Sequence, residues 1–306
     1  MKNMKHLKNN RIKISLSDSV YLGIVYIFLF LFTLIVLYPL IYVVSCSFSS
    51  AESLVQGQVF FLPANPGLQG YHAVFSNKQV WRGYYNTIVY TALGTAIGVM
   101  VTITGSFVLS RKEFPMRNFI TALFTVTMFF GGGMIPFYLL IKNLRLVDTI
   151  WAIVLPGAFN VWLGIVGRTF IQSTISEELF EATSLDGGSY FHFFTRVVLP
   201  LSKPILAVLA LNFAVGHWNS YFNALIFFND FDKFPLQLVL RNILISNKID
   251  PASLNATDAK TLMEKQYLAE LMKYSSIIVS SAPLLIVYPF VQKYFIKGVM
   301  VGSIKG

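Results

Sequence analysis

"VYLGIVYIFLFLFTLIVLYPLIYVV", residues Val20–Val44, is an apolar run without a single charged residue. A helix that crosses the hydrocarbon core of a bilayer needs about 20 predominantly apolar residues. The run is too long for the core of a signal peptide, and no clear cleavage site accompanies it. We therefore interpret it as a retained membrane-spanning helix, and the fold follows from it.

More runs of this kind follow along the chain, at about residues 85–109, 119–141, 150–171, 204–228 and 275–295. Because no backbone amide can remain unpaired in hydrocarbon, helices are the economical structure for all of them. The chain has 306 residues, of which 55% are hydrophobic and 12% charged, about half the charged fraction of a soluble domain. The expected fold is all-α and integral to the membrane, with six transmembrane helices.

The net charge of +10 is distributed in a way that predicts orientation. Lysines and arginines crowd residues 2–13, before the first run, and recur in alternate gaps between runs and near the C-terminus. This pattern follows the positive-inside bias, so we expect both termini in the cytoplasm. A nucleic-acid partner would need a basic groove instead, and we expect none. The predicted organisation is a cytoplasmic tail at 1–19, a six-helix domain at 20–296 and a cytoplasmic tail at 297–306.

Signatures of catalysis are missing from the sequence. There is no G-x-x-x-x-G-K-[ST] phosphate loop, so the chain is not expected to hydrolyse ATP by that route. The single cysteine, Cys46, allows no internal disulfide. His217 has no second His or Cys at a spacing that suits a metal. We expect no catalytic residues, no metal site and no cofactor in this chain.

"GGGMIP", Gly131–Pro136, interrupts the third run. Three glycines and a proline can unwind a helix at membrane depth where the backbone borders protein or a water-filled cavity. Small residues can instead allow close packing of helices. The sequence leaves both interpretations open. Further prolines in or near the runs are tolerated kinks or transport hinges: Pro39, Pro156, Pro283 and Pro289.

"STISEELFEATSLDGGSYFHFFTRVVLP", residues 173–200, lies in the predicted cytoplasmic loop 172–203. Ser176 is a good N-cap for a short helix whose first turn carries two glutamates. Gly187 and Gly188 can end that helix and reverse the chain. Ser189 can cap a second, aromatic-rich helix that ends before Pro200. The residues alone favour equally a helix that docks on a partner and an amphipathic hairpin on the bilayer.

The same segment resembles a motif of the membrane subunits of binding-protein-dependent ABC importers. That motif reads Glu-Ala-Ala, three residues, Gly, nine residues, Ile, one residue, Leu-Pro. The chain has Thr183 at the second Ala and Val197 at the Ile, both conservative departures. The resemblance implies a type I ABC importer permease fold with a cytoplasmic coupling helix between spans 4 and 5. Its implied ATPase-coupling residues are Glu181, Ala182, Thr183, Asp186, Gly187, Leu199 and Pro200.

The resemblance extends over nearly the whole chain. The C-terminal residues 288–306 and "WNSYFNALIFF" at 218–228 are similar to carbohydrate-import permeases of the maltose-permease G type. Residues 131–162 look like the branch of lipoprotein- and polysaccharide-linked sugar permeases. This implies a subunit in a bacterial cell membrane that imports an oligosaccharide or glycan. It also implies a heterodimer with a second homologous permease, two ATPase subunits that bind ATP and Mg²⁺, and an extracellular sugar-binding lipoprotein, all in membrane lipid.

Polar and aromatic side chains on or near the fifth run are candidates for the substrate pathway. Amides hydrogen-bond sugar hydroxyls and aromatic rings stack on sugar faces, although polar residues in spans also join helices to each other. The candidates are Asn212, His217, Trp218, Asn219, Tyr221 and Asn223. The external segment 229–274 is a candidate docking site for the lipoprotein or a solvated loop.

Two other functions compete with an ABC permease. A self-contained, ion-coupled secondary transporter normally needs ionisable residues inside the membrane, and the apolar runs hold almost none. A scaffolding protein would explain the spans but would leave the spacing of the motif to chance. We therefore expect a permease driven by separate ATPases.

Overall fold

The computed structural model describes residues 15–246 and 259–303, and all the regular elements in these ranges are helices, with no strand among them. The three longest helices are α1 (Leu16–Ser47), α4 (Lys78–Ser110) and α15 (Ala259–Ser303). The others are α2 (Ala51–Val55), α3 (Gln69–Phe75), α5 (Arg117–Phe129), α6 (Met134–Asn143), α7 (Trp151–Val154), α8 (Val161–Thr174), α9 (Glu177–Leu185), α10 (Tyr190–Phe193), α11 (Leu199–Leu201), α12 (Lys203–Trp218), α13 (Phe222–Phe227), α14 (Leu236–Ser246), the π-helical η1 (Phe194–Val198) and the 3₁₀-helical η2 (Phe231–Lys233).

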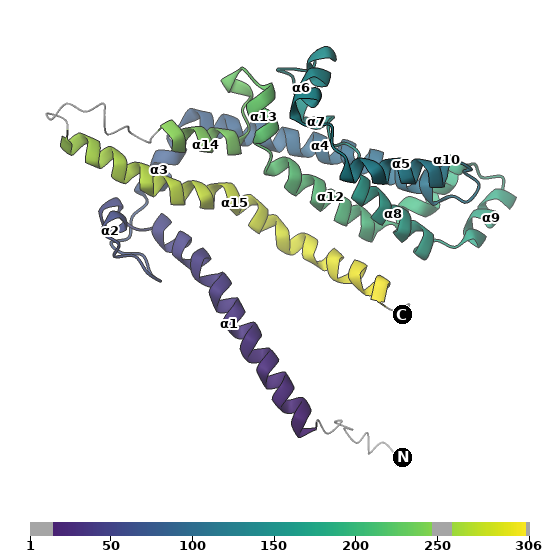
Figure 1. The fold of residues 1–306 in the computed structure, drawn as a ribbon, viewed down its shortest axis with the longest axis horizontal. Helices are drawn as coiled ribbons and strands as arrows, with labels where there is room; N and C mark the ends of the chain where they lie inside the picture. The colour runs from purple at the N-terminus through teal and green to yellow at the C-terminus, as the bar shows by residue number, and fades with distance from the viewer. Residues whose placement is uncertain (1–14, 247–258, 304–306) are drawn as a thin grey trace, which may run out of the picture.

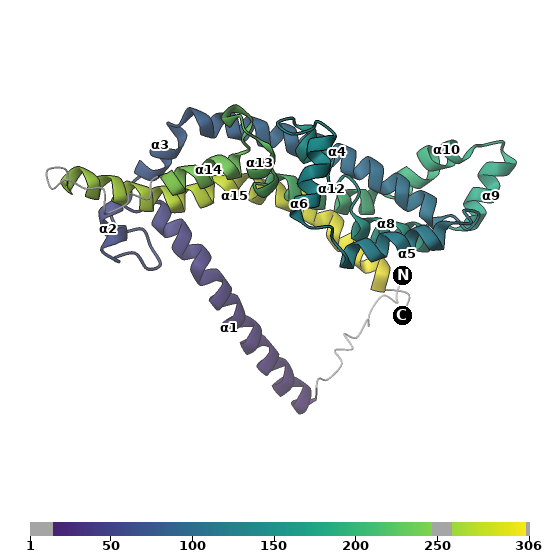
Figure 2. The ribbon, with the colours of Figure 1, turned by 45° about the horizontal axis from the view of Figure 1, so that its top comes forward.

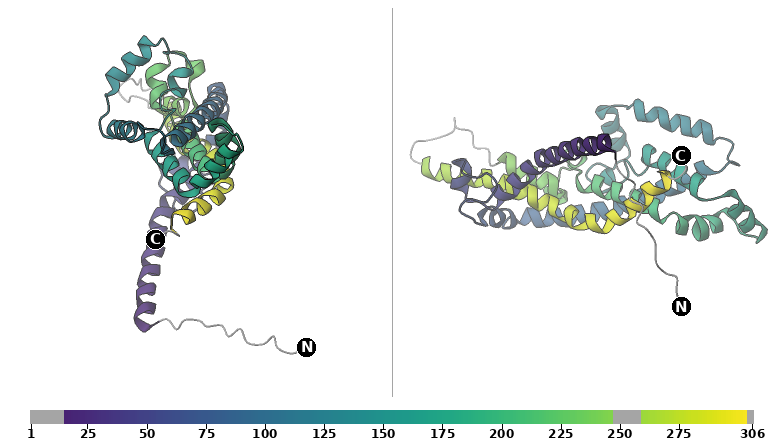
Figure 3. Two further views of the ribbon diagram at one scale, coloured as in Figure 1. Left: turned by 90° about the vertical axis from the view of Figure 1, so that its right-hand side faces the viewer. Right: turned by 90° about the horizontal axis from the view of Figure 1, so that it is seen from below.

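The molecule is elongated, with α4 running along its length (Figure 1). Helices α9 and α10 form one end, and α3, α14 and the first turns of α15 lie at the other (Figures 1 and 2). Helix α1 leaves the bundle at an angle, as the view along the long axis shows (Figure 3). Its most apolar window is not buried at all within the chain. Such a helix is suited to lipid or to another membrane protein.

Within residues 15–246 and 259–303, three helices are long and apolar enough to cross a membrane, or up to five if each bent pair counts as one span. The first, second and last predicted runs lie in α1, α4 and α15. The fifth becomes α12 and the separate α13. The prediction of one continuous helix at 150–171 is wrong, because the chain leaves helical geometry between α7 and α8. Pro156 lies in that break, whereas Pro39, Pro283 and Pro289 sit inside continuous helices.

The glycines of "GGGMIP" break the third run. Helices α5 and α6 meet at 118° across them, and Gly133 has a φ of +82°. A Cβ built on any of Gly131, Gly132 or Gly133 would meet no described atom within 4 Å. These glycines therefore do not serve close packing within the chain; Gly133 instead supplies a backbone conformation that other residues rarely adopt.

Close packing through small residues occurs on α4. A Cβ at Gly98 would lie 2.7 Å from ring carbons of Phe213 on α12, and one at Gly94 would overlap the imidazole of His217. On the side facing α8, the Ser106 hydroxyl donates to the Gly164 carbonyl at 3.0 Å. The glycine- and threonine-rich second run is thus the central helix on which α8 and α12 pack.

The predicted external segment 229–274 is not a solvated loop at residues 236–246, where α14 forms and packs on α4. Leu236 and Leu238 are fully buried, and the Leu236 amide donates to the Thr87 hydroxyl at 2.8 Å. The Asn86 amide donates to two carbonyls just before α14, at 2.7 and 3.0 Å. Polar side chains of α4 therefore hold this segment in place. Residues 247–258 of the predicted docking segment lie outside the described part of the chain.

Candidate functional site

Residues 176–201, here called the hairpin, project at the end of the molecule (Figure 1). Helix α9 follows Ser176 and carries Glu177 and Glu178 in its first turn, as predicted. At its end the Gly187 amide donates to the Ser184 carbonyl at 3.0 Å and the Gly188 amide donates to the Thr183 carbonyl at 2.8 Å. This pair of bonds is the Schellman arrangement, which requires a left-handed residue between helix and turn. Gly187 provides it, with a φ of +77°.

The two turn glycines have different roles. A Cβ at Gly187 would meet no described atom within 4 Å, so no clash there requires a glycine. The clash occurs at Gly188 instead, where a Cβ would lie 2.8 Å from the Thr183 carbonyl oxygen. Within the described chain, Gly187 is therefore required for its backbone conformation. Gly188 is required because the end of α9 leaves no room there for a Cβ.

The second limb of the hairpin begins as predicted and ends later. The Ser189 hydroxyl accepts a hydrogen bond from the His192 amide at 3.2 Å, which caps α10. The expectation that this helix ends before Pro200 is wrong, because α10 continues through η1 and α11 to Leu201. The π-helical turn lies directly before α11, in which Pro200 is an early residue. It then bends by 81° into α12.

Aromatic side chains join the two limbs to the bundle. The Phe180 ring stacks on Tyr190 at 4.9 Å and meets the edge of Phe193 at 5.2 Å between centroids. Phe193 is almost completely buried and lies next to Phe107 of α4. Burial of such rings is strongly favourable and is directional. The hairpin is therefore continuous with the core rather than loosely attached.

Arg111, the residue that ends α4, holds the base of the hairpin. Its guanidinium forms ion pairs with Glu113, at 2.9 Å, and with Glu177, and its side chain is only 11% exposed. The same group lies over the Phe180 ring. One cation thus connects the C-terminal end of α4 with the first turn of α9.

The outer surface of the hairpin presents apolar side chains without partners in the described chain. Leu185 is 90% exposed and Phe191 74% exposed. Glu181, Ala182, Asp186 and Gly187 are also exposed, whereas Thr183 and Leu199 are partly covered and Pro200 is exposed at the far end of the second limb. The predicted coupling residues therefore form no joint cluster: five surround the turn, and Leu199 and Pro200 lie where the hairpin meets α12.

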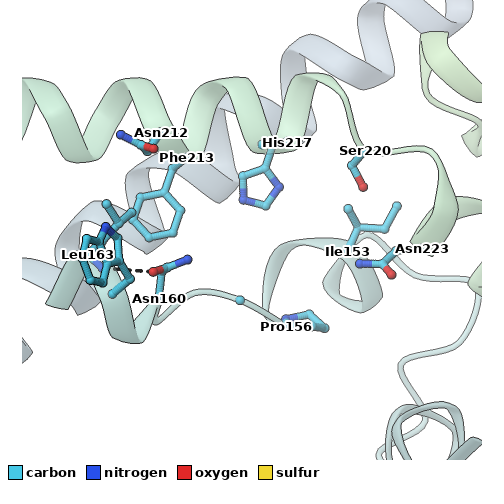
Figure 4. Close-up of a pocket in the computed structure, with 12 residues that line it drawn as sticks. Ile153, Pro156, Asn160, Leu163, Asn212, Phe213, His217, Ser220 and Asn223 are labelled. Carbon is cyan, nitrogen blue, oxygen red and sulfur yellow. Dashed lines mark hydrogen bonds between the residues drawn. The ribbon is translucent and has the colours of Figure 1, made fainter. Parts of the chain in front are cut away.

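A cavity of about 330 Å³ lies between α12 and the break that separates α7 from α8. Figure 4 shows Asn212, Phe213 and His217 along α12, opposite Pro156 and Asn160. Of the pathway candidates, Asn212, His217 and Asn223 line this cavity. Its walls combine amides and an imidazole with apolar surface, a mixture suited to sugar hydroxyls and sugar faces.

The other pathway candidates do not line that cavity. Trp218 is buried, and its indole N–H donates to the Ser280 carbonyl at 2.9 Å, which joins α12 to α15. Asn219 donates to the carbonyl of Val215 on its own helix. Tyr221 lines a different cavity. Trp218 thus matches the alternative role of joining helices.

Asn160 is a cavity residue that the sequence analysis missed. Its side-chain oxygen accepts from the Leu163 amide at 3.0 Å and caps α8. An asparagine directly before an apolar helical stretch is a recognisable N-cap signal. The prediction of one span at 150–171 passed over this signal, although Pro156 and Gly157 stand just before it.

At the opposite end of the bundle, Asp148 joins two connecting segments. Its carboxylate accepts from the Lys233 ammonium at 2.7 Å and from the Asn229 amide at 3.2 Å. Asp148 has a φ of +61°, and Lys233 also donates to its carbonyl at 3.0 Å. The hydrogen bond from Lys233 holds the pKa of Asp148 below its usual value, and the same bond raises the pKa of Lys233. This ion pair fixes the α6–α7 connection to η2.

No protein-family model matches the chain, but individual proteins do. It is similar to Protein LplC of Bacillus subtilis (strain 168), with 39% identity over 89% of this chain and 90% of that one. The polygalacturonan/rhamnogalacturonan transport system permease protein YtcP of the same organism is 34% identical over 92% of this chain and 97% of its own length. A chain in the crystal structure of a bacterial ABC transporter that imports the acidic polysaccharide alginate has a TM-score of 0.82 and 34% identity. That match covers 92% of this chain and 98% of the other.

Proposed function

The chain belongs to the permease subunits of carbohydrate ABC importers, and on that premise we propose how its parts divide the work. As in other such subunits, it has no ATPase site of its own and is a transport component rather than an enzyme. It forms half of a translocation pathway for an oligosaccharide or glycan, and the hairpin receives the force of ATP hydrolysis. The observation that carries this division is the rigidly anchored hairpin with its exposed apolar tip.

Coupling requires a part that is rigid toward the membrane and accessible toward the cytoplasm. The buried Phe193 and the ion-paired Arg111 supply the first property. The exposed Leu185, with Glu181 and Gly187 beside it, supplies the second. In this proposal α9 is the coupling helix and docks in a groove of an ATPase subunit. An amphipathic hairpin lying on lipid is less well supported, because the exposed apolar residues gather at the tip.

The proposed pathway runs past the cavity between α12 and the α7–α8 break. Asn160, Asn212, His217 and Asn223 would exchange hydrogen bonds with successive sugar hydroxyls. Such contacts are individually weak, so a sugar can move between them. The break between α7 and α8 supports this role, since irregular backbone at membrane depth is tolerated beside a cavity.

The topology we propose has six spans in a bacterial cell membrane. The spans are α1, α4, α5, α8, α12 and α15, with both termini and the hairpin in the cytoplasm, following the distribution of basic residues. Family membership implies ATPase and binding-protein partners in general. The specific assembly proposed is a heterodimer with a second permease and two ATPase subunits, which bind ATP and Mg²⁺. An extracellular lipoprotein would deliver the sugar.

Affinity purification of the tagged chain from its own membranes in mild detergent tests the assembly. We expect a second six-span permease and an ATPase to be recovered with it, and the same purification from a Leu185→Glu variant to lose the ATPase while it retains the permease. A well-folded chain that is recovered alone would contradict the proposal and bring back the ion-coupled transporter. A Leu185→Glu variant that keeps its ATPase would contradict the role of the tip.

A further inference from the structure

A second cavity, of about 400 Å³, adjoins the break between α12 and α13. Its walls come from α14, α15 and Tyr221. The preceding residue, Ser220, lines the cavity of Figure 4, so consecutive residues of one turn border the two cavities. The second cavity lies toward the end of the molecule opposite the hairpin, where α14 is found (Figure 1).

Arg241 gives this cavity a positive charge that the described chain does not balance. It is the one Lys, Arg, Asp or Glu among the lining residues. Its guanidinium makes a single long contact, 3.5 Å from Nη1 to the Asn242 side-chain oxygen, and no described carboxylate lies within 4 Å of it. A guanidinium is a planar fork of donors that matches the two oxygens of a carboxylate. An unpaired fork beside a cavity is therefore a place for an anion.

Ser276 is the independent observation. It is only 2% exposed, it lines the cavity, and its buried hydroxyl oxygen has no hydrogen-bond partner among the described residues. Buried hydroxyls without partners are rare because the loss of hydrogen bonds to water is costly. Gln237 adds an amide and Tyr221 an aromatic ring to the same walls. The cavity thus offers a cation, polar hydrogen-bonding groups and a stacking surface together.

We propose that this cavity binds an acidic sugar unit, with the carboxylate on Arg241. Hydroxyls of the unit would bond Ser276 and Gln237, and its apolar face would lie on Tyr221. The inference rests on the proposed carbohydrate-import function and narrows its substrate class to uronic-acid oligosaccharides.

The test is ATP-driven uptake by the complete importer in proteoliposomes, with galacturonic-acid oligomers and their methyl esters as probes. The variants are Arg241→Gln and Arg241→Lys, and the matched control is Arg145→Gln, at an exposed arginine. For Arg241→Gln we expect the ratio of acid to ester uptake to fall about tenfold, the size of one lost charge-assisted hydrogen bond. Arg241→Lys should fall between Arg241→Gln and the wild type, because it keeps the charge but loses the fork, and Arg145→Gln should match the wild type.

The experiment distinguishes failure of the acidic subsite from failure of the proposed import function. Uptake of neutral oligosaccharides alone by the wild type, or equal losses of acid and ester in Arg241→Gln, would overturn the acidic subsite and leave the importer function intact. Equal losses of acid and ester uptake would mean that Arg241 serves in helix packing or binds a lipid phosphate. If the wild type takes up the acid but not the ester, uptake of the acid by Arg241→Lys is the deciding measurement. A loss of acid uptake in Arg241→Lys as large as that in Arg241→Gln would overturn the proposal. No ATP-dependent uptake of any carbohydrate would overturn the proposed function itself.

Discussion

The guanidinium carbon of Arg111 lies 4.1 Å from the centre of the Phe180 ring, so the end of α4 and the first helix of the hairpin share one cation. The contact is largely shielded from water, because the Arg111 side chain is 11% exposed. Ion pairs to Glu113 and Glu177 orient the same group. A displacement of the hairpin would therefore be transmitted directly to the central helix of the bundle.

Replacing Arg111 should loosen the hairpin without unfolding the bundle. For Arg111→Ala we expect about 1–2 kcal/mol of lost local stability, mostly from the cation–π contact, since Glu177 is partly solvated. Hydrogen exchange of the α9 amides should then accelerate about tenfold. Lys112→Ala is the matched control, because that side chain is 74% exposed. Unchanged exchange in Arg111→Ala would show that the aromatic contacts alone hold the hairpin.

Gly187→Asp should uncouple the importer. A left-handed residue other than glycine costs about 1–2 kcal/mol, and a carboxylate at the exposed turn would disturb docking on the ATPase. We expect normal membrane insertion, persistent ATP hydrolysis and loss of sugar uptake. Gly57→Asp is the control, because Gly57 has a similar φ of +68° and equally open surroundings but lies far from the hairpin in sequence. Normal uptake by well-expressed Gly187→Asp would remove the turn from the coupling site.

Gly98→Ala should destabilise the bundle because its new methyl group would press on the Phe213 ring. Overpacking of this kind costs about 1–3 kcal/mol, which lowers the midpoint of thermal unfolding by a few degrees. Gly23→Ala on α1 is the control, since nothing lies within 4 Å of its Cβ position. Equal midpoints for the two variants in the purified complex would mean that α12 moves away from α4 at no cost.

The Asp148–Lys233 ion pair predicts a loss of stability in acid. The pKa of Asp148 is lowered in the folded protein, so its contribution is present above the unfolded pKa of about 4 and disappears as the pH falls through the folded value. The raised pKa of Lys233 makes its contribution disappear only at strongly alkaline pH. Thermal unfolding midpoints from pH 6 to pH 3 should fall less in Asp148→Asn than in the wild type. Asp232→Asn, at an exposed residue, should follow the wild type, and parallel curves for all three proteins would contradict the assignment.

Asn223→Trp should obstruct the pathway, whereas Asn219→Trp should not. The two asparagines are near neighbours in sequence, but only Asn223 lines the cavity between α12 and the α7–α8 break, and Asn219 is exposed beside it. An indole in place of the amide would fill much of the roughly 330 Å³ available. We expect Asn223→Trp to reduce uptake at least tenfold while the complex still assembles. Equal uptake by both variants would place the pathway elsewhere.

Much of the architecture is readable locally. The run Val20–Val44 must be a helix because lipid offers no other partner for its backbone. The two glutamates of the first turn and Gly187 mark the limits of α9 through the helix dipole and the C-cap, whereas the Ser176 side chain makes no capping hydrogen bond. The same stretch carries the family motif, so the class of function was predictable from residue order alone.

Other features depend on partners distant in sequence. The break at Leu155–Asn160 has local signals, Pro156-Gly157 and the N-cap Asn160, but its place in the wall of a cavity depends on α12. The sequence does not indicate that Gly188 rather than Gly187 faces a steric limit, since that depends on where the Thr183 carbonyl ends. Of six similar pathway candidates, three line the cavity of Figure 4, because the direction of a side chain on α12 is set by its packing on α4 and α15.

The sequence by itself determined that the chain is a helical membrane permease and where α9 begins and ends, because hydrophobic run length, helix-end signals and motif spacing are properties of neighbouring residues. Only the tertiary structure decided which polar groups are satisfied and which are left facing a cavity. Arg241 and Ser276 lie 35 positions apart, and nothing near either residue reveals that α14 and α15 bring them to one cavity. Whether a buried polar group has a hydrogen-bond partner depends on the positions of all the groups around it. It is therefore a property of the whole fold.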